Sequence, residues 1–370
     1  MISRRRFLQL GVMSGAGLLL GVRSGARADG ATPVGELRVL HPLIQVEPNG
    51  RVVLFAQNPE MGQGVKTSLP IILAEELDVR FEDVVVRQAD WLPGQDLQFS
   101  GGSLSIRLNY QAMREAGAAA RQMLIQAAAA RWALAADALS TADGRVQSAD
   151  GQRTATYGEL AAEAARLPLP EDVSLKSPAA FRIVGRSHSD VDLASILKGE
   201  PLYSLDLKLP GMLYAVVRRS PVSDGQVAAF DDRAARAVPG VREVHALSNE
   251  RFGGRIILPN SPNFVSGVAV LADHTWAALQ GAQALDVQWR NPPTLEDTDA
   301  LFARFHAGLA AEPVQVRRDG EPESLLAAGA DVFEQVYQLP LLAHAPMEPM
   351  NCTARYADGR VELWASRGSW

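Results

Sequence analysis

The sequence has almost no cysteine: of its 370 residues, only Cys352 carries a thiol. One thiol cannot close an internal disulfide, and it cannot by itself hold an iron–sulfur cluster or a cysteine-type zinc site. The six histidines never fall at the HxH or HExxH spacings that mark many metal sites. The sequence therefore gives little support for a metal held directly by protein side chains.

Positive charge is also scarce. The chain has 36 Lys and Arg against 42 Asp and Glu, which gives a formal net charge of −6. Residues 1–28 contain five arginines and no acids, so their removal would bring the formal charge to −11. Because a nucleic-acid partner requires a basic surface that neutralises phosphates, nucleic-acid binding is not expected.

A long hydrophobic run is missing as well. The apolar run Leu8–Val22 is shorter than the roughly twenty residues of a membrane-spanning helix, so no stable membrane span is expected. It lies between a cluster of arginines and a small-residue ARA sequence ending at Ala28, which is the pattern of a cleaved export signal. Ser3–Gln9 (SRRRFLQ) also fits the twin-arginine pattern. We therefore expect residues 1–28 to be a twin-arginine signal peptide and the protein to be periplasmic, with an ordinary secretory signal as the alternative.

The stretch NPEMGQGVKTSLPIILAEEL (Asn58–Leu77) places a tight turn directly before a helical pattern. Gly62 and Gly64 allow backbone conformations that a Cβ would hinder, and Gln63 between them offers one acceptor and two donors. Free amide groups and the helix dipole at such a turn form an anion cradle. The spacing matches neither GxGxxG nor GxxxxGK, so it does not favour a nicotinamide or P-loop site. An ordinary structural turn remains the alternative.

The residues after this turn predict an amphipathic helix. Thr67 or Ser68 is expected as its N-cap, and Pro70 then falls in the first turn, where its missing N–H costs nothing. The acidic pair Glu75 and Glu76 has the spacing of an ordinary helix face. The sequence therefore predicts a helix that begins near residue 68.

A second glycine-rich turn, Gly101–Ser105 (GGSLS), also leads into a helix. The helix is expected over residues 108–139, and its many alanines favour close packing as a buried scaffold. The Ser103 and Ser105 hydroxyls add donors and acceptors for a polar ligand. A large phosphate-bearing cofactor that spans both turns would explain the pair, whereas two unrelated helix starts would not need a ligand.

The remainder of the first half predicts a mixed fold. Two strands are expected around the Pro48–Gly50 turn, a further strand at Asp83–Arg87, and a short helix at Tyr157–Arg166. Prolines at 168, 170 and 178 then indicate a domain boundary.

The second half alternates strands with short helices. Between about 190 and 292 this alternation predicts a compact α+β domain, with a strand pair expected within residues 207–221. Residues 293–330 are charged and alanine-rich, which favours a helical connector. Residues 331–370 return to a strand pattern.

Several short sequence motifs together resemble one protein family. EMGQGVKT, AEEL and GGSLS in the first half, and AHAPMEPMNCTARYADGRVELWAS near the end, are similar to the molybdenum-binding subunit of the isoquinoline 1-oxidoreductase and aldehyde oxidoreductase group of the xanthine oxidase family. The resemblance covers about residues 35–366. It implies an α+β fold in which residues 29–185 form a first molybdopterin-binding segment, 190–292 an inserted hammerhead-like domain, and 331–370 the start of a second molybdopterin-binding segment.

The resemblance also implies a cofactor and a reaction. The cofactor is molybdopterin carrying molybdenum, in this group often in the cytosine dinucleotide form, and it supplies its own metal ligands. The implied reaction is hydroxylation of N-heterocycles or oxidation of aldehydes with water as the oxygen source, and electrons pass to a small iron–sulfur subunit or a cytochrome c. The positions that match the cofactor contacts are Gly62, Gln63 and Gly64 in the first turn and Gly102, Ser103, Leu104 and Ser105 in the second.

The sequence departs from this family at its end. Family members are much longer, and their catalytic glutamate would lie beyond Trp370, so no catalytic residue is assigned here. Glu348 matches a different family position and is not expected to be the base, and His344 is expected to be structural. We therefore expect either a subunit completed by a second chain that carries the missing half, as from a split gene, or a truncated and catalytically inactive fragment.

The signal sequence gives a first testable prediction. Replacing Arg4 and Arg5 with lysine keeps the charge but removes the twin-arginine pattern, so the precursor is expected to stay in the cytoplasm. Cell fractionation followed by immunoblotting measures this. Continued export of the double variant would instead indicate the ordinary secretory route.

Overall fold

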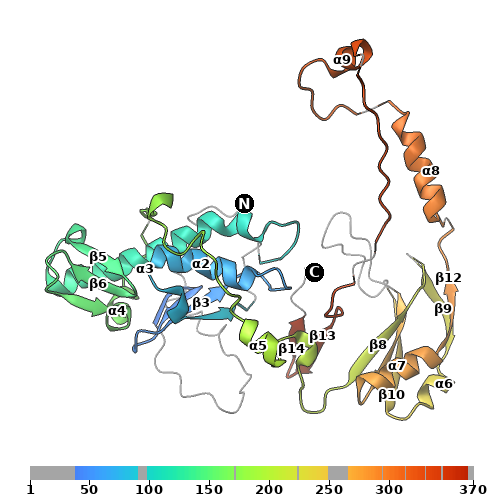
Figure 1. Ribbon diagram of the computed structural model, residues 1–370. Coiled ribbons are helices and arrows are strands. Elements are labelled where there is room, and N and C mark those ends of the chain that lie inside the picture. The colour runs from blue at the N-terminus through green and yellow to red at the C-terminus, as the bar shows by residue number, and fades with distance from the viewer. Residues whose placement is uncertain are drawn as a thin grey trace. The chain divides into compact units, whose positions relative to one another are not determined.

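The computed structural model describes residues 38–90, 98–170, 172–222, 225–248, 266–293, 295–312, 314–329, 331–342 and 345–365 (Figure 1). The expected signal peptide, residues 1–28, lies outside these residues. The chain divides into two compact units: unit 1 comprises Met1–Leu207 with His344–Trp370, and unit 2 comprises Lys208–Ala343. Each unit has a hydrophobic core of its own.

Unit 1 is built on a four-stranded sheet with the order β1-β2-β3-β4. The expected turn at Pro48–Gly50 joins β2 to β3, and Gly50 adopts a left-handed φ of 88° there. β4 pairs in parallel with β3, so a helix must cross between them. The strands are β1 (Arg38–His41), β2 (Ile44–Val46), β3 (Val52–Ala56) and β4 (Val84–Gln88).

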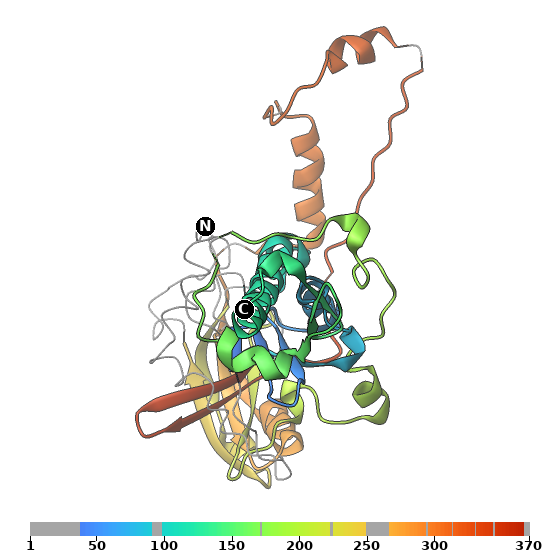
Figure 2. The same ribbon diagram turned by 90° about the vertical axis from the view of Figure 1, so that its left-hand side faces the viewer.

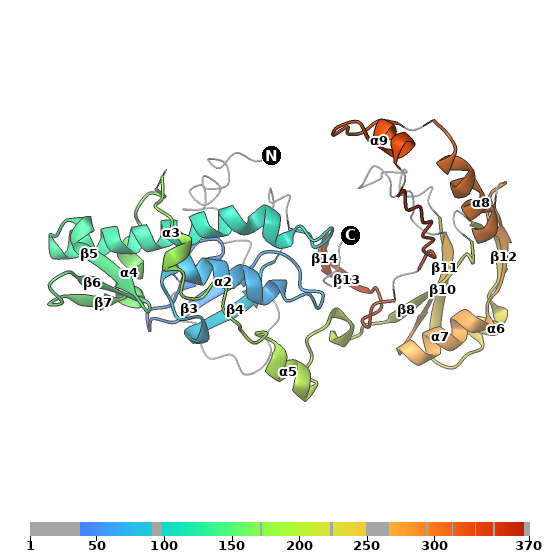
Figure 3. The same cartoon turned by 45° about the horizontal axis from the view of Figure 1, so that its top comes forward.

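Two long helices, α2 (Val65–Leu77) and α3 (Ser105–Trp132), lie side by side over this sheet (Figures 1 and 3). Gly117 permits their close approach, because a Cβ there would lie 2.7 Å from the Leu73 carbonyl oxygen. The alanines of α3 at 116, 118–120, 127 and 128 are buried, which confirms the expected scaffold helix. The largest side chains of this core with under 2% exposure include Leu43, Ile44, Leu54, Leu69, Leu73, Leu77, Met113, Leu124, Tyr157 and Leu160.

Both helices begin earlier than the sequence predicted. α2 starts at Val65 with Gly64 as its N-cap, so the expected caps Thr67 and Ser68 were wrong and Pro70 lies inside the helix. The Ser68 hydroxyl instead donates to the Gly64 carbonyl (2.8 Å).

The end of α3 was also predicted wrongly. The helix begins at Ser105 and stops at Trp132 rather than near 139, because Ala133 takes a left-handed φ of 53°. The amide of Ala133 bonds back to the Ala129 carbonyl, which closes the last turn.

A small sheet and a short helix complete the far end of unit 1. The helix α4 (Tyr157–Ala164) begins with a capping box between Thr156 and Glu159. The buried Tyr157 hydroxyl donates to the Leu77 carbonyl at the end of α2 (2.7 Å), and burial raises the pKa of this phenol. The sheet consists of β5 (Leu139–Ala142), β6 (Arg145–Ser148) and β7 (Thr154–Thr156).

An extended segment, residues 172–192, crosses α2 from its C-terminal end to its N-terminal end; we call it the strap. Near its start, the Lys176 ammonium lies 2.9 Å from a carboxylate oxygen of Glu75. At its end, Asp192 pairs with the buried Lys66 ammonium at 2.6 Å, and the Val191 amide donates to the Thr67 hydroxyl (3.1 Å). The strap is therefore held at both ends of α2.

The prediction of an ordinary helix face for Glu75 and Glu76 was wrong. The two residues are 1% and 0% exposed, because the strap and α3 cover them. Glu75 accepts the Ile183 and Val184 amides at 2.6 and 3.0 Å, and Glu76 pairs with the Arg114 guanidinium at 2.7 Å. We call the whole set the buried charge cluster: Glu75, Glu76 and Asp78 on and after α2, with Arg114, Arg121, Lys176 and Arg182 around them.

The pKa of Glu75 reflects its hydrogen bonds more than its burial. Burial by itself raises this pKa, but the amide of Ile183, the Lys176 ammonium and the amide of Val184 outweigh it. The pKa therefore lies below its ordinary value of 4.5. Glu75 stays ionised at neutral pH and holds the strap as an anion.

Unit 2 contains a three-stranded antiparallel sheet with the order β10-β11-β8 and a separate β9–β12 ladder. The helix α7 (Thr275–Ala284) packs against β8 and β11, where Gly281 leaves room for two valines of the sheet. The predicted strand pair at 207–221 was wrong in part, because only β8 forms there. The strands are β8 (Tyr214–Arg219), β9 (Gln226–Asp231), β10 (Val241–Leu247), β11 (Gly267–Ala272) and β12 (Asp286–Arg290), with α6 (Arg233–Arg236) after β9.

The remaining elements leave much apolar surface exposed. In unit 2, α8 (Thr298–Leu309) and α9 (Pro322–Ala328) extend away from the sheets (Figures 1 and 2), and the following segment 331–342 exposes Phe333 at 84%. In unit 1, the hairpin of β13 (Cys352–Ala357) and β14 (Arg360–Ala365) is also largely exposed.

The mixed helix and strand content confirms the α+β class. The helices in the described part of the chain are all too short or too polar to cross a bilayer. The domain limits expected from the sequence, and the hammerhead-like nature of residues 190–292, stay predictions.

The buried charge cluster gives a stability prediction. Glu75→Gln is expected to lower the free energy of unfolding at pH 7 by about 3 kcal/mol, because it leaves the largely covered Lys176 without one of its two carboxylates. A carboxylate with a lowered pKa stabilises the fold fully above pH 4.5 and loses this effect as the pH falls through the folded-state value. The difference between Glu75→Gln and the native protein should therefore shrink below pH 4.5.

Urea unfolding at pH 7 and at pH 4 measures both effects. Glu82→Gln is the matched control, because the Glu82 side chain is 68% exposed and contacts only Arg80 at 4.0 Å. An equal loss at both pH values, or no loss at pH 7, would contradict the role given to the ionised carboxylate.

Candidate functional site

The structure brings the two predicted glycine-rich turns together at one end of α2 and α3. We call Asn58–Gly64 the first tip and Gln98–Ser105 the second tip. The Asn58 side-chain amide donates to the Phe99 carbonyl (2.7 Å), and the Ser100 hydroxyl donates to the Pro59 carbonyl (2.6 Å). The predicted site residues of both tips therefore share one surface of unit 1.

The glycines of the first tip are required by the backbone. Gly62 has φ of 98° and Gly64 has φ of 79°, which are left-handed conformations that side chains rarely adopt. A Cβ at either position would meet no atom within 4 Å, so the constraint is conformational rather than one of space. These residues turn the chain so that the amides around them face inward.

The side chain of Glu60 fills the concavity that these amides form. One carboxylate oxygen accepts the Gly62 and Gly64 amides at 2.7 and 3.0 Å, and the other accepts the Lys66 amide at 2.8 Å. The sequence prediction of free amides in the first tip was therefore wrong. Glu60 was missed because it lies upstream of the glycines, where a capping side chain is not normally sought.

Gln63, the predicted amide at the tip, also bonds within the chain. Its side-chain oxygen accepts the Met61 amide (2.7 Å), and its side-chain nitrogen donates to the Pro59 carbonyl (3.1 Å) and the Ser100 hydroxyl (3.2 Å). The residue is nevertheless exposed. Gln63 therefore links the two tips and remains accessible to a ligand that offers better partners.

A buried amide network lies beneath the two tips. Asn109 on α3 donates to the Asn58 side-chain oxygen (3.1 Å) and accepts from the Gln57 side chain (3.3 Å). Gln57 is 3% exposed, and its side-chain oxygen has no hydrogen-bond partner among the described residues. This network fixes the register of β3 against α3, and no spacing signal in the sequence indicated it.

The second tip is open, in contrast to the first. Gly102 and Ser103 both have left-handed φ values, 59° and 56°, and Leu104 is the N-cap of α3 without any side-chain cap. Within the described chain, the hydroxyls of Ser103 and Ser105 make no hydrogen bond. Within the part of the chain that the structure describes, the start of this 28-residue helix therefore offers amides without a side-chain cap and two hydroxyls without a hydrogen bond.

Arg107 adds positive charge at this helix start and was missed by the sequence prediction. It lies in the first turn of α3, where no acidic residue occurs, and it is exposed. Among the residues that the structure describes, no carboxylate pairs with its guanidinium. The signal for it was the unusual placement of a base where helices favour acids.

Several large apolar side chains in the two tips and the first turn of α3 are exposed. Met61 is 58% exposed, and Phe99, Ile106 and Leu108 are 39%, 38% and 42% exposed. Large apolar side chains gathered beside free polar groups are typical of a surface that binds something else. The tips therefore combine hydrogen-bonding groups with apolar contact area.

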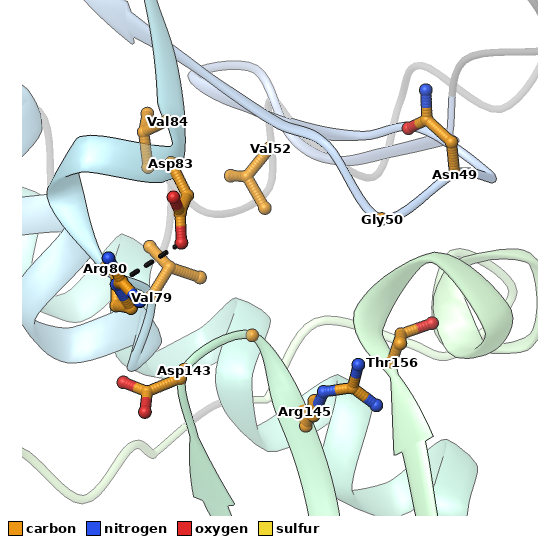
Figure 4. A pocket seen from close by; sticks show the side chains of 11 residues that line it. Asn49, Gly50, Val52, Val79, Arg80, Asp83, Val84, Asp143, Arg145 and Thr156 are labelled. Carbon is orange, nitrogen blue, oxygen red and sulfur yellow. Dashed lines mark ion pairs between the residues drawn. The ribbon is translucent and has the colours of Figure 1, made fainter.

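A pocket of about 200 Å³ lies elsewhere in unit 1, between the β2–β3 turn and the β5–β6 turn (Figure 4). Arg80 and Asp83 form an ion pair in it (3.4 Å), and Asp143 and Arg145 lie across from them (Figure 4). Its charges balance, and none of the predicted site residues lines it. We therefore place the candidate site at the tips.

The other candidate residues of the sequence do not form a reactive centre. Glu348 accepts the Leu205 amide (3.2 Å) and the Asn351 side chain (3.0 Å). Cys352 is exposed on β13, and His344 lies outside the described residues. Across the part of the chain with described coordinates, no three His, Cys, Asp or Glu residues are grouped to hold a metal ion.

The region that holds the two tips is similar to a known family. Residues 13–192 match the molybdopterin cofactor-binding domain family, and the match ends with the strap. The chain is 30% identical to the beta chain of the isoquinoline 1-oxidoreductase of Brevundimonas diminuta, over 98% of this chain and 51% of that protein.

Two further relatives are similar over most of this chain. A component of the nicotinate dehydrogenase of Pseudomonas putida is 28% identical over 92% of this chain and 28% of its own length. The membrane-bound aldehyde dehydrogenase (pyrroloquinoline-quinone) of Gluconacetobacter polyoxogenes is 25% identical over 98% of this chain and 47% of its own length. The chain thus spans about half or less of the length of these relatives.

The amide network gives a prediction for the site. Asn109→Ala is expected to lower the free energy of unfolding by about 1–3 kcal/mol, because it leaves buried amides of Gln57 and Asn58 with fewer partners. This loss of stability is expected even though alanine has a higher helix propensity than asparagine. Gln111→Ala, on an exposed face of the same helix, is the control for urea unfolding. A stable Asn109→Ala variant would show that the tips do not depend on the network.

Proposed function

We propose that the two tips hold part of a molybdopterin cofactor, because residues 13–192 match the molybdopterin cofactor-binding domain family. One observation carries the proposal: among the described residues, the Ser103 and Ser105 hydroxyls make no hydrogen bond, the start of α3 has no side-chain cap, and Arg107 in its first turn has no carboxylate partner. Such a group of donors suits a phosphate, which a helix start binds well.

The two tips would have different roles toward this cofactor. Glu60 already satisfies the inward amides of the first tip, so a second anion there would meet a carboxylate. The phosphate-bearing end of the cofactor therefore belongs at Gly102–Ser105 and Arg107. Gln63, exposed and able to exchange an internal hydrogen bond, would support the pterin end beside Gly62 and Gly64.

The residues present fit such a group in two further respects. The side-chain oxygen of Gln57, in the network that joins the tips, accepts no hydrogen bond from the described residues. A donor group from outside the described chain could therefore bond to it. The exposed side chains of Met61, Phe99, Ile106 and Leu108 offer apolar contact that would suit the faces of a flat ring system. When bound, the cofactor would supply the molybdenum chemistry, and the protein would bind it, orient it and exclude water.

We propose an oxidoreductase subunit that hydroxylates N-heterocycles or oxidises aldehydes with water as the oxygen source. The names of the relatives, an isoquinoline oxidoreductase, a nicotinate dehydrogenase and an aldehyde dehydrogenase, support these substrate classes. Because the chain covers about half of the first relative, the rest of the site, including the base, would come from a polypeptide that matches the other half. Electrons would pass to an iron–sulfur subunit or a cytochrome c.

Further features belong to the same proposal. The cofactor would be the cytosine dinucleotide form, whose length suits a site that spans two tips. Export by the twin-arginine route to the periplasm would follow loading of this cofactor. Residues 190–292 would be the inserted hammerhead-like domain.

Cofactor content tests the proposal. The full chain, purified from a host that makes molybdopterin, is expected to contain pterin at well below one equivalent. Combined Ser103→Ala, Ser105→Ala and Arg107→Ala is expected to lower this content at least about tenfold, because charge-assisted bonds to a phosphate are lost. Fluorescence of the oxidised pterin measures it, and Arg80→Ala, which changes an arginine away from the tips, is the control.

Co-expression separates the proposed enzyme from the inactive fragment. With a polypeptide that matches the second half of the relatives, molybdenum content and oxidation of isoquinoline or an aldehyde with an artificial acceptor should both rise. Gln63→Ala should then impair turnover more than folding. Equal pterin in the triple variant and the native chain would refute the site, and bound cofactor without turnover would indicate an inactive fragment.

A further inference from the structure

Glu60 is anchored from the sheet as well as from the tip. Its backbone amide donates to the side-chain oxygen of Gln88 at the end of β4 (3.3 Å). The side-chain nitrogen of Gln88 donates in turn to the Ala56 and Asn58 carbonyls (2.8 and 3.0 Å). The start of the first tip is therefore fixed on β3 and β4, and the Glu60 carboxylate reaches from this fixed point into the turn.

Among the residues that the structure describes, the amides that Glu60 accepts have no other carboxylate acceptor. α2 has no side-chain N-cap at Gly64 and no acidic residue in its first turn. A carboxylate that accepts several amides at a helix start forms charge-assisted bonds and complements the helix dipole. Without Glu60, the amides of Gly62, Gly64 and Lys66 would face an empty concavity.

We propose that Glu60 is the positioning residue of the first tip, an internal anion that holds residues 61–66 in one conformation and thereby fixes the direction of the Gln63 side chain. The link to Gln63 is short: the Met61 amide, between Glu60 and the glycines, donates to the Gln63 side-chain oxygen at 2.7 Å. The relevance of this arrangement to a cofactor rests on the proposed function.

The Glu60 carboxylate also determines which part of a ligand can bind at the first tip. Because the concavity of the first tip holds a negative charge, an anionic group of a ligand is repelled there and directed to the second tip, whose donors are free. Loss of Glu60 should therefore both loosen the first tip and create a vacant anion site beside Gln63. Small carboxylates should bind that vacant site.

Chemical rescue tests the inference on the full chain. In Glu60→Ala, hydrogen–deuterium exchange of the amides in residues 61–67 is expected to rise at least about tenfold, because charge-assisted hydrogen bonds are lost. Addition of formate should restore the protection, since formate fits the space of the missing carboxylate. Formate should not alter exchange in the native chain, whose concavity is filled.

Two matched variants control the experiment. Glu60→Gln keeps the size of the side chain and one acceptor oxygen, so its exchange should fall between the native chain and Glu60→Ala. Glu82→Ala removes an exposed carboxylate from the same unit and should change nothing at the first tip. Unchanged exchange within α3 shows that the variants keep their fold.

The outcomes separate this inference from the proposed function. Native-like exchange at 61–67 in both Glu60 variants, or exchange in Glu60→Ala that formate does not slow, would overturn the positioning role. Faster exchange that formate reverses supports it. If that result comes with unchanged pterin content and turnover, Glu60 positions the first tip but the first tip does not serve the cofactor.

Discussion

The packing of the strap and α3 against α2 depends on two carboxylates that water does not reach. Glu75 and Glu76 on α2 are almost fully buried, and their partners come from two other parts of the chain, α3 and the strap. A buried charge without a partner is strongly unfavourable, so these segments can assemble only in the arrangement that pairs every member. Apolar packing would tolerate a slipped register of the strap, whereas this cluster does not.

The cluster determines the geometry of the tips through the helices. It fixes the C-terminal end of α2 against the middle of α3, where Gly117 lets the two backbones approach closely. The starts of both helices, where the tips lie, are then joined by the amide network under them. The outcome is one tip whose amides are satisfied by Glu60 and one whose donors are free. A ligand with a charged end and a polar, uncharged end is oriented by that difference.

The sequence predicted the elements better than their ends and their partners. Local sequence patterns predicted the hairpin, the two long helices and their glycine-rich starts. The motifs shared with the family, EMGQGVKT and GGSLS, located the tips. The start of α2 was misjudged because its capping group, Glu60, acts across a turn made by left-handed glycines rather than from the N-cap position. The role of Glu75 and Glu76 was missed because Lys176 and the Ile183 amide lie about a hundred residues away. Local spacing carries no information on contacts between residues so far apart. The one hint in the sequence was that the two acids lie between Leu73 and Leu77, which are buried.

The strap also determines where this protein can accommodate new sequence. It ends at Asp192, which is tied to Lys66 at the start of α2, and the match to the cofactor-binding family ends at the same residue. The contacts between the strap and α2 are complete at Asp192, so they do not depend on the length of the segment downstream. The segment after Asp192 could therefore be replaced or lengthened in evolution while the contacts of the strap with α2 stay the same. The ion pair between Asp192 and Lys66 thus marks a position after which the fold can accept an insertion.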